Sequence, residues 1–98
     1  MMNKMRPIHP GEILKKELTT LGYSASYFAA KLHVPVNRIT AILKGQRSIT
    51  ADTALRLAKF FSTTPEFWLN LQNAYDLKVT NLRIGKRIER EVENRKVA

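Results

Sequence analysis

The side chains with the most evident chemistry lie between residues 34 and 47, in the segment VPVNRITAILKGQR. This segment is rich in amide, hydroxyl and basic side chains, and it contains no acidic residue. An amide or guanidinium group can make two hydrogen bonds to the edge of a nucleic-acid base, and basic side chains bind phosphate. The segment therefore fits either an ordinary surface helix with a hydrated side or a helix that lies against a negatively charged partner.

The apolar residues of this segment recur at helical spacing. Ile39, Ile42 and Leu43 would share one face of a helix that runs from about Pro35 to Lys44. The remaining positions are polar, basic or small: Asn37, Arg38, Thr40, Ala41 and Lys44.

The net charge of +9 is distributed unevenly along the chain. Residues 1–47 carry a net charge of +6, residues 48–77 carry −1 and residues 78–98 carry +4. Excess basic charge can serve solubility alone, but here it coincides with the segment at 34–47 and with the tail. This distribution favours a polyanionic partner.

Composition excludes several classes of protein. The 98 residues suit one small domain with a single core, and the absence of cysteine excludes disulfides and cysteine nucleophiles. No stretch reaches the roughly 18 apolar residues of a membrane helix, and the first residues lack a signal-peptide pattern. We therefore expect a soluble cytoplasmic protein without a membrane partner.

Motifs for catalysis are also lacking. His9 and His33 have no metal-binding spacing, so structural or solvent-exposed roles are expected for both. No nucleophile motif, paired-acid motif or phosphate-binding loop is present, so we expect no enzyme activity and no cofactor.

Capping residues divide the chain up to about Leu77 into five helices. The residues expected to begin or end these helices are Pro10, Gly22, Ser24, Pro35, Gly45, Thr50 and Thr64. No stretch alternates as a strand would, so the predicted fold class is all-α, with a compact domain over residues 1–77. Residues 78–98 form a basic C-terminal tail. It could be a marginal helix weakened by Gly85, a partner-dependent segment or a mobile end.

The second and third predicted helices are short, and only about three residues separate them. Two such helices joined by a tight turn form a helix-turn-helix, whose second helix fits a major groove about 12 Å wide.

Longer segments carry a resemblance to a known family. YFAAKLHVPVNRITAILKGQR resembles the helix-turn-helix of the Xre/Cro-like, or lambda-repressor-like, repressors. The flanking segments IHPGEILKKEL and ITADTALRLAKFFSTTPEFWLNLQNAYDL are similar to the HigA group of antitoxins from toxin–antitoxin operons. The resemblance covers residues 7–77. It implies a dimer that represses its own operon and neutralises a cognate HigB-like toxin that cleaves messenger RNA.

The family pattern, together with the basic residues that follow the third helix, gives the expected DNA contacts. They are Ser24, Ser26, Val36, Asn37, Arg38, Thr40, Ala41, Lys44 and Arg47. Asn37 could read adenine, cap the start of the helix or contact a phosphate, and Arg38 could read guanine or clamp a phosphate. The chain departs from the family at Ala25, where relatives often have a DNA-anchoring glutamine, and at His33, where they often have glycine.

The fifth predicted helix is apolar on more than one side, which favours a second partner. One face would meet the core and the other a second subunit, with Trp68, Leu71 and Tyr75 at the dimer interface. A helix wholly buried in its own domain is the alternative. Two other functions compete with that of an antitoxin. They are a helix-turn-helix regulator without a toxin, and an adaptor whose basic charge serves a protein partner.

Overall fold

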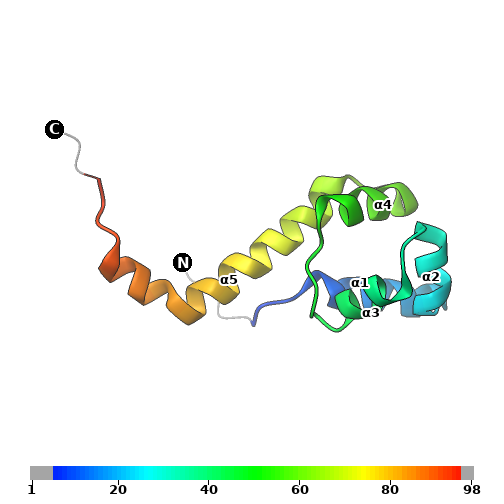
Figure 1. Ribbon diagram of the computed structural model, residues 1–98, viewed down its shortest axis with the longest axis horizontal. Coiled ribbons are helices and arrows are strands. Elements are labelled where there is room, and N and C mark those ends of the chain that lie inside the picture. The colour runs from blue at the N-terminus through cyan, green and yellow to red at the C-terminus, as the bar shows by residue number, and fades with distance from the viewer. Residues whose placement is uncertain (1–5, 96–98) are drawn as a thin grey trace.

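The computed structural model describes residues 6–95, and its regular elements within this range are all helices. They are α1 (Pro10–Leu21), α2 (Ala25–Leu32), α3 (Val36–Leu43), α4 (Ala51–Phe61) and α5 (Pro65–Glu91). Figure 1 shows α1 to α4 and the start of α5 gathered into one body, from which the rest of α5 extends. The prediction of an all-α, five-helix fold is therefore confirmed.

Local sequence sets most of the helix ends. Ser24 and Thr64 cap α2 and α5, since each hydroxyl oxygen accepts a main-chain N–H three residues on, at 3.1 and 3.2 Å. Gly22 ends α1 with a φ of 72°, a conformation that glycine adopts without strain. Thr50 occupies the N-cap position of α4, but its side chain makes no capping bond and its hydroxyl donates to Thr53 at 3.5 Å. Thr50 was therefore correctly predicted as the N-cap residue, but the side-chain capping bond expected of it is not formed.

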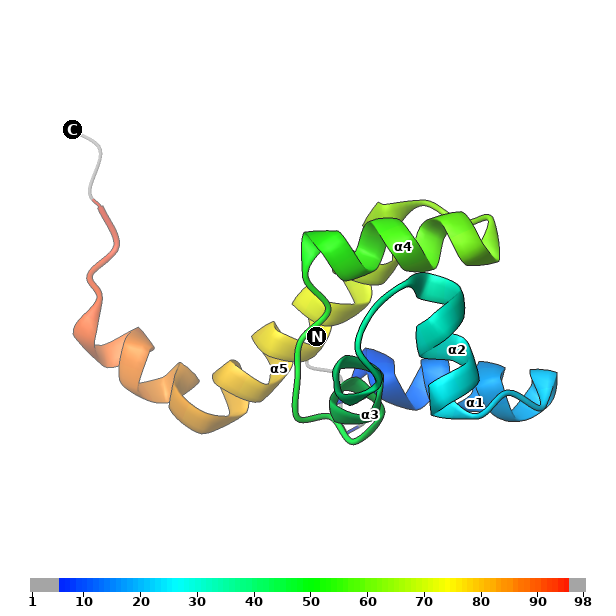
Figure 2. The same ribbon diagram turned by 45° about the vertical axis from the view of Figure 1, so that its right-hand side comes forward.

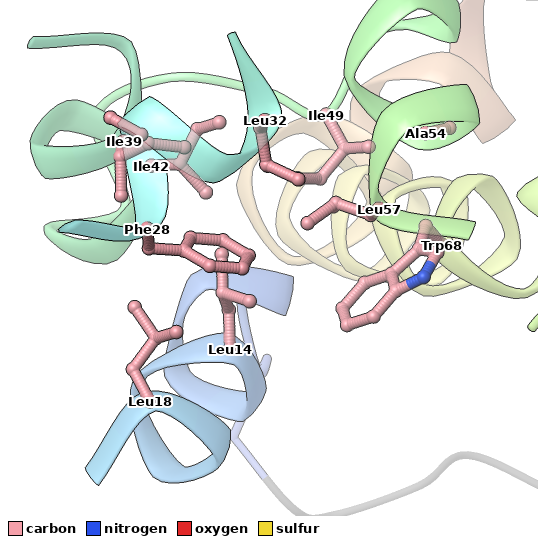
Figure 3. Close-up of a cluster of buried hydrophobic side chains, with 11 residues drawn as sticks. Leu14, Leu18, Phe28, Leu32, Ile39, Ile42, Ile49, Ala54, Leu57 and Trp68 are labelled. Carbon is pink, nitrogen blue, oxygen red and sulfur yellow. The ribbon is translucent and has the colours of Figure 1, made fainter. Parts of the chain in front are cut away.

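One hydrophobic core joins all five helices. Figure 3 shows Phe28 of α2 and Leu14 of α1 packed below Ile39 and Ile42 of α3, with Leu57 of α4 beside them. All five side chains are fully buried. Burying a side chain of this size stabilises the fold by about 1.5–3 kcal/mol. Because the contributions come from different helices, the same contacts that stabilise the fold fix α3 in place.

The first turn of α1 approaches the main chain at the end of α3. A Cβ atom on Gly11 would overlap the main-chain oxygen of Ile42 and lie 2.8 Å from its carbonyl carbon. His9 caps this end of α1, because its Nδ1 accepts the Gly11 N–H at 2.8 Å. Its ring also meets the ring of Tyr75 edge-on, with 4.9 Å between centroids. His9 therefore has the structural role that was one of the two expected for it.

α5 is one helix of 27 residues and continues past Leu77. The domain boundary expected at that residue coincides with no break in secondary structure, because residues 78–91 form the second half of the helix. Gly85 lies within this half, and the three atoms nearest to an added Cβ there belong to the Asn81 side chain. Figures 1 and 2 both show the helix axis bending in this second half.

Candidate nucleic-acid interface

α2, the turn at residues 33–35 and α3 form a helix-turn-helix. In Figure 2, α2 stands upright while α3 is seen nearly end-on, so the two helices cross steeply. His33 takes the left-handed conformation, with φ 58° and ψ 47°, and its N–H donates to the Ala30 carbonyl at 3.2 Å. Histidine is among the non-glycine residues that adopt this conformation more readily. It therefore forms the turn where the family often has glycine.

α3 buries one side and exposes the other. Ile39 and Ile42 are fully buried. At about 100° per residue, Asn37, Ala41 and Lys44 project from the opposite side of the helix. The residues of α3 that were predicted to contact DNA are all exposed or partly exposed. They are Val36, Asn37, Arg38, Thr40 and Ala41. The helix thus presents mainly small and hydrogen-bonding side chains outward.

The start of α2 supplies hydroxyl and main-chain donors. Ser24 and Ser26 are exposed, and the Ser24 oxygen is already occupied as acceptor of the Tyr27 N–H. Its hydroxyl hydrogen remains able to donate. The first N–H groups of a helix and its dipole attract anions, so this end of α2 suits a phosphate.

Exposed basic side chains follow α3. Lys44 and Arg47 are both exposed, and neither forms an ion pair within residues 6–95. Gly45, between them, has a φ of 72°. Burial lowers the pKa of the His9 imidazole, which caps α1. The ring carbon Cγ of His9 would lie 3.7 Å from a Cβ atom on Gly45, so the start of α1 packs against this loop while Lys44 and Arg47 remain exposed.

Arg38 belongs to a network that links three helices. Its Nη1 donates to Oδ1 of Asp52 on α4 at 2.6 Å, and Nε of Arg56 donates to the same oxygen at 2.8 Å. Nη1 of Arg56 donates to the carbonyl of Leu32, the last residue of α2, at 2.9 Å. The hydrogen bonds from Arg56 and, second, from Arg38 lower the pKa of Asp52.

This network was not predicted from the sequence. Asp52 and Arg56 stand four residues apart on one helix, which is a visible signal for a pair. Arg38 is 14 residues before Asp52, and no local pattern indicates that contact. The Arg38 side chain is only 22% exposed, and its buried Nε has no acceptor within residues 6–95.

The residues predicted for the dimer interface lie mainly against their own protomer. Trp68 is 2% exposed, and its Nε1 donates to the Thr63 hydroxyl at 3.0 Å. It belongs to the core, so its assignment to a dimer interface was wrong. Leu71 packs against the same core and Tyr75 against His9, although both keep some exposure. A helical pattern reveals two apolar sides but does not say which of them meets the core.

Comparison with known proteins identifies the family. A family model described as helix-turn-helix matches residues 14–68, from α1 into α5. The structure of an addiction module antidote protein of a HigA family from Coxiella burnetii is 65% identical, with a TM-score of 0.90. That similarity covers 93% of this chain and 100% of the Coxiella chain. This chain belongs to the HigA family of helix-turn-helix proteins.

Two further members of the HigA family extend the comparison. The Pseudomonas aeruginosa antitoxin HigA, solved with the higBA promoter, is 44% identical with a TM-score of 0.87, over 90% of this chain and 97% of that chain. Antitoxin HigA-1 of Vibrio cholerae is 40% identical over 75 residues, which cover 76% of this chain and 70% of the relative. The resemblance found in the segments on either side of the helix-turn-helix is thereby confirmed.

Metal-binding groups and membrane-spanning helices are two further features that residues 6–95 of this HigA-family chain lack. Residues 6–95 contain no group of three or more histidine, cysteine or acidic residues placed to hold a metal ion. No helix in the described part of the chain has the length and apolar character needed to cross a bilayer.

Proposed function

We propose that this HigA-family chain is the antitoxin of a toxin–antitoxin operon, and that it binds the operator DNA of that operon as a homodimer and represses transcription. The observation that carries the proposal is the presentation of α3. Its apolar side is fixed in the core, while its outer side offers hydrogen-bonding and basic groups. A helix presented in this way fits the major groove of B-DNA.

Base contacts are assigned to the exposed and partly exposed residues of α3. The Asn37 amide can pair with N6 and N7 of adenine, and the Arg38 guanidinium can pair with guanine. The smaller side chains of α3 suit contacts with the methyl groups of thymine and close contacts with base edges. They are Val36, Thr40 and Ala41. A good bidentate contact provides about 1–3 kcal/mol of discrimination against the wrong base.

Phosphate contacts are assigned to the two ends of the helix-turn-helix. Ser24 and Ser26 lie at the start of α2, and Lys44 and Arg47 lie where the chain leaves α3. These groups carry little sequence information, but they fix the register of the protein on the duplex. They also supply the salt-dependent part of the affinity.

Dimerisation is assigned to the side of α5 that turns away from the core. Leu77 is 72% exposed, and Ile88 is 42% exposed. Together with the half-buried Ile84, these residues lie roughly opposite Trp68 when successive residues are separated by about 100°. A twofold dimer would place two copies of α3 about 34 Å apart, in successive major grooves of a pseudo-palindromic operator.

The toxin is the third partner in this proposal. The protein would act in the cytoplasm by binding DNA and toxin, without an enzymatic step of its own. Co-expression with the product of the adjacent gene tests this part, because the antitoxin should co-purify with that product and relieve its toxicity. A regulator without a toxin would bind the operator and leave the neighbouring product unbound.

DNA binding is tested by titrating the DNA upstream of the gene, and scrambled DNA of equal length, at several salt concentrations. About six to eight phosphate contacts per dimer predict a slope of log affinity against log salt between roughly −5 and −7. Arg38→Ala should reduce the preference for the upstream DNA. A flat salt response, or equal weak binding of both DNAs by both proteins, would instead favour an adaptor that uses its basic charge for a protein partner.

A further inference from the structure

We propose that Asp52, at the start of α4, is a positioning residue for DNA recognition that holds the Arg38 guanidinium of α3 in the orientation in which it meets the operator. The inference rests on the proposed DNA-binding function and assigns a role there to a residue outside the helix-turn-helix. It follows from three features of the contact between α3 and α4.

Arg38 depends on Asp52 for its orientation. The hydrogen bond of 2.6 Å from Nη1 to Oδ1 is the one that the guanidinium makes within residues 6–95. Its Nε is buried without an acceptor in the same range, so nothing else at that atom fixes the plane of the group. Arginine has many rotamers when unrestrained. Without Asp52, no hydrogen bond within residues 6–95 would therefore fix the direction of the guanidinium.

Asp52 is itself a fixed acceptor. Arg56 donates to the same carboxylate oxygen at 2.8 Å, and Arg56 is in turn held by the Leu32 carbonyl at 2.9 Å. The carboxylate also lies in the first turn of α4, where the helix dipole stabilises negative charge. Because Leu32 ends α2, the chain of bonds gives Arg38 an orientation fixed relative to both helices of the helix-turn-helix.

The remaining donors of Arg38 suit a DNA contact. Within residues 6–95, the second Nη1 hydrogen and the Nη2 group have no acceptor. Because the guanidinium is already oriented, less side-chain entropy is lost when it meets its base. On other DNA, where the acceptor is not in line with the guanidinium, the contact is weaker. The guanidinium would have to break its hydrogen bond with Asp52 to reach that acceptor. Asp52 thus increases the difference between operator and other DNA.

A matched pair of variants tests this role. Asp52 is the second residue of α4, and Glu66 is the second residue of α5, so each is an exposed acid in the first turn of a helix. Glu66 forms no ion pair within residues 6–95. Asp52→Ala and Glu66→Ala therefore remove the same charge and a similar dipole interaction, but only the first removes the partner of Arg38.

The measurement is the ratio of affinities for the upstream DNA and for scrambled DNA, by fluorescence anisotropy at fixed salt. We expect Asp52→Ala to lower this ratio by about tenfold or more, the lower part of the range for one well-placed base contact. Its affinity for scrambled DNA should match or exceed that of the wild type, since one negative charge is lost. Glu66→Ala should keep the wild-type ratio. Asp52→Asn, which keeps an oxygen acceptor but no charge, should give an intermediate ratio and replaces Asp52→Ala if that variant does not fold.

The same substitution in an Arg38→Ala background should leave the ratio unchanged. The proposal is overturned if Asp52→Ala keeps the wild-type ratio, if it weakens binding to both DNAs by the same factor, or if it lowers the ratio further without Arg38. The DNA-binding function itself is judged on the wild type alone. A wild-type protein that does not prefer the upstream DNA refutes that function whatever the variants do.

Discussion

A methyl group added at Gly11 should destabilise the fold, because Gly11 packs directly against the main chain of Ile42. The added Cβ of Gly11→Ala would overlap the main-chain oxygen of Ile42 and lie 2.8 Å from its carbonyl carbon and 3.0 Å from Nδ1 of His9. A carbonyl within helical main chain cannot rotate away as a side chain can. α1 and the end of α3 would therefore have to separate by roughly 1 Å or more, which disturbs the core beneath them.

The magnitude follows from two opposing effects. Overpacking costs about 1–3 kcal/mol, and a clash with main chain belongs at the upper end of that range. Alanine recovers about 0.5–1 kcal/mol because it is a better helix residue than glycine. The net loss of unfolding free energy is about 2 kcal/mol. For a domain of this size that corresponds to a melting temperature lower by roughly 10 °C.

Gly85→Ala is the matched control for Gly11→Ala. The atoms nearest to its added Cβ belong to the Asn81 side chain, which can move, and Gly85 lies within α5. Alanine there should stabilise the helix by about 0.5–1 kcal/mol. Thermal unfolding followed by circular dichroism, at one protein concentration for all variants, gives both values. A Gly11→Ala protein that melts at or above the wild-type temperature would refute the close approach of α1 and α3.

Three further predictions concern stability and assembly. Gln72→Met should lower the unfolding free energy in urea by about 1–3 kcal/mol, because the buried Ile49 N–H loses the Gln72 oxygen that accepts it at 2.8 Å. His9 has a pKa lowered by burial and must keep Nδ1 unprotonated to cap α1, so it stabilises the fold above pH 6.5. That stability should be lost as the pH falls through the folded-state pKa, and His9→Asn should weaken the dependence measured between pH 5 and 7.5. Leu77→Glu should shift sedimentation towards the monomer at unchanged helicity, whereas Leu55→Glu, on α4, should not. Leu55 is 60% exposed and Leu77 72%, and a dimeric Leu77→Glu protein would place the interface elsewhere.

The sequence predicted what depends on local patterns. Helix periodicity and capping residues placed α1 to α4, and His33 formed the turn expected of it. A helix was one of three alternatives left open for the tail, because Gly85 weakens a helix by up to about 1 kcal/mol, and it is the one that residues 78–91 adopt. The surrounding helix-forming residues outweigh the penalty of Gly85. Trp68 was misplaced for a different reason. Its burial is decided by tertiary packing against α4, which periodicity along one helix does not encode.

The basic residues of the proposed interface divide into two kinds, and this division gives α4 a role in the proposed recognition. Lys44 and Arg47 are exposed, and in the proposed complex they would attract any DNA and so raise affinity without raising preference. Asp52 partly offsets the charges of Arg38 and Arg56, with which it pairs in the absence of DNA, so Arg38 adds less to the attraction that ignores sequence. Preference for an operator is a difference between two affinities. In the proposed complex, Arg38 stays paired with Asp52 when the protein is on other DNA, and it is correctly oriented toward one base of the operator. Arg38 therefore contributes to that difference, and Asp52, which is responsible for both properties, lies on α4.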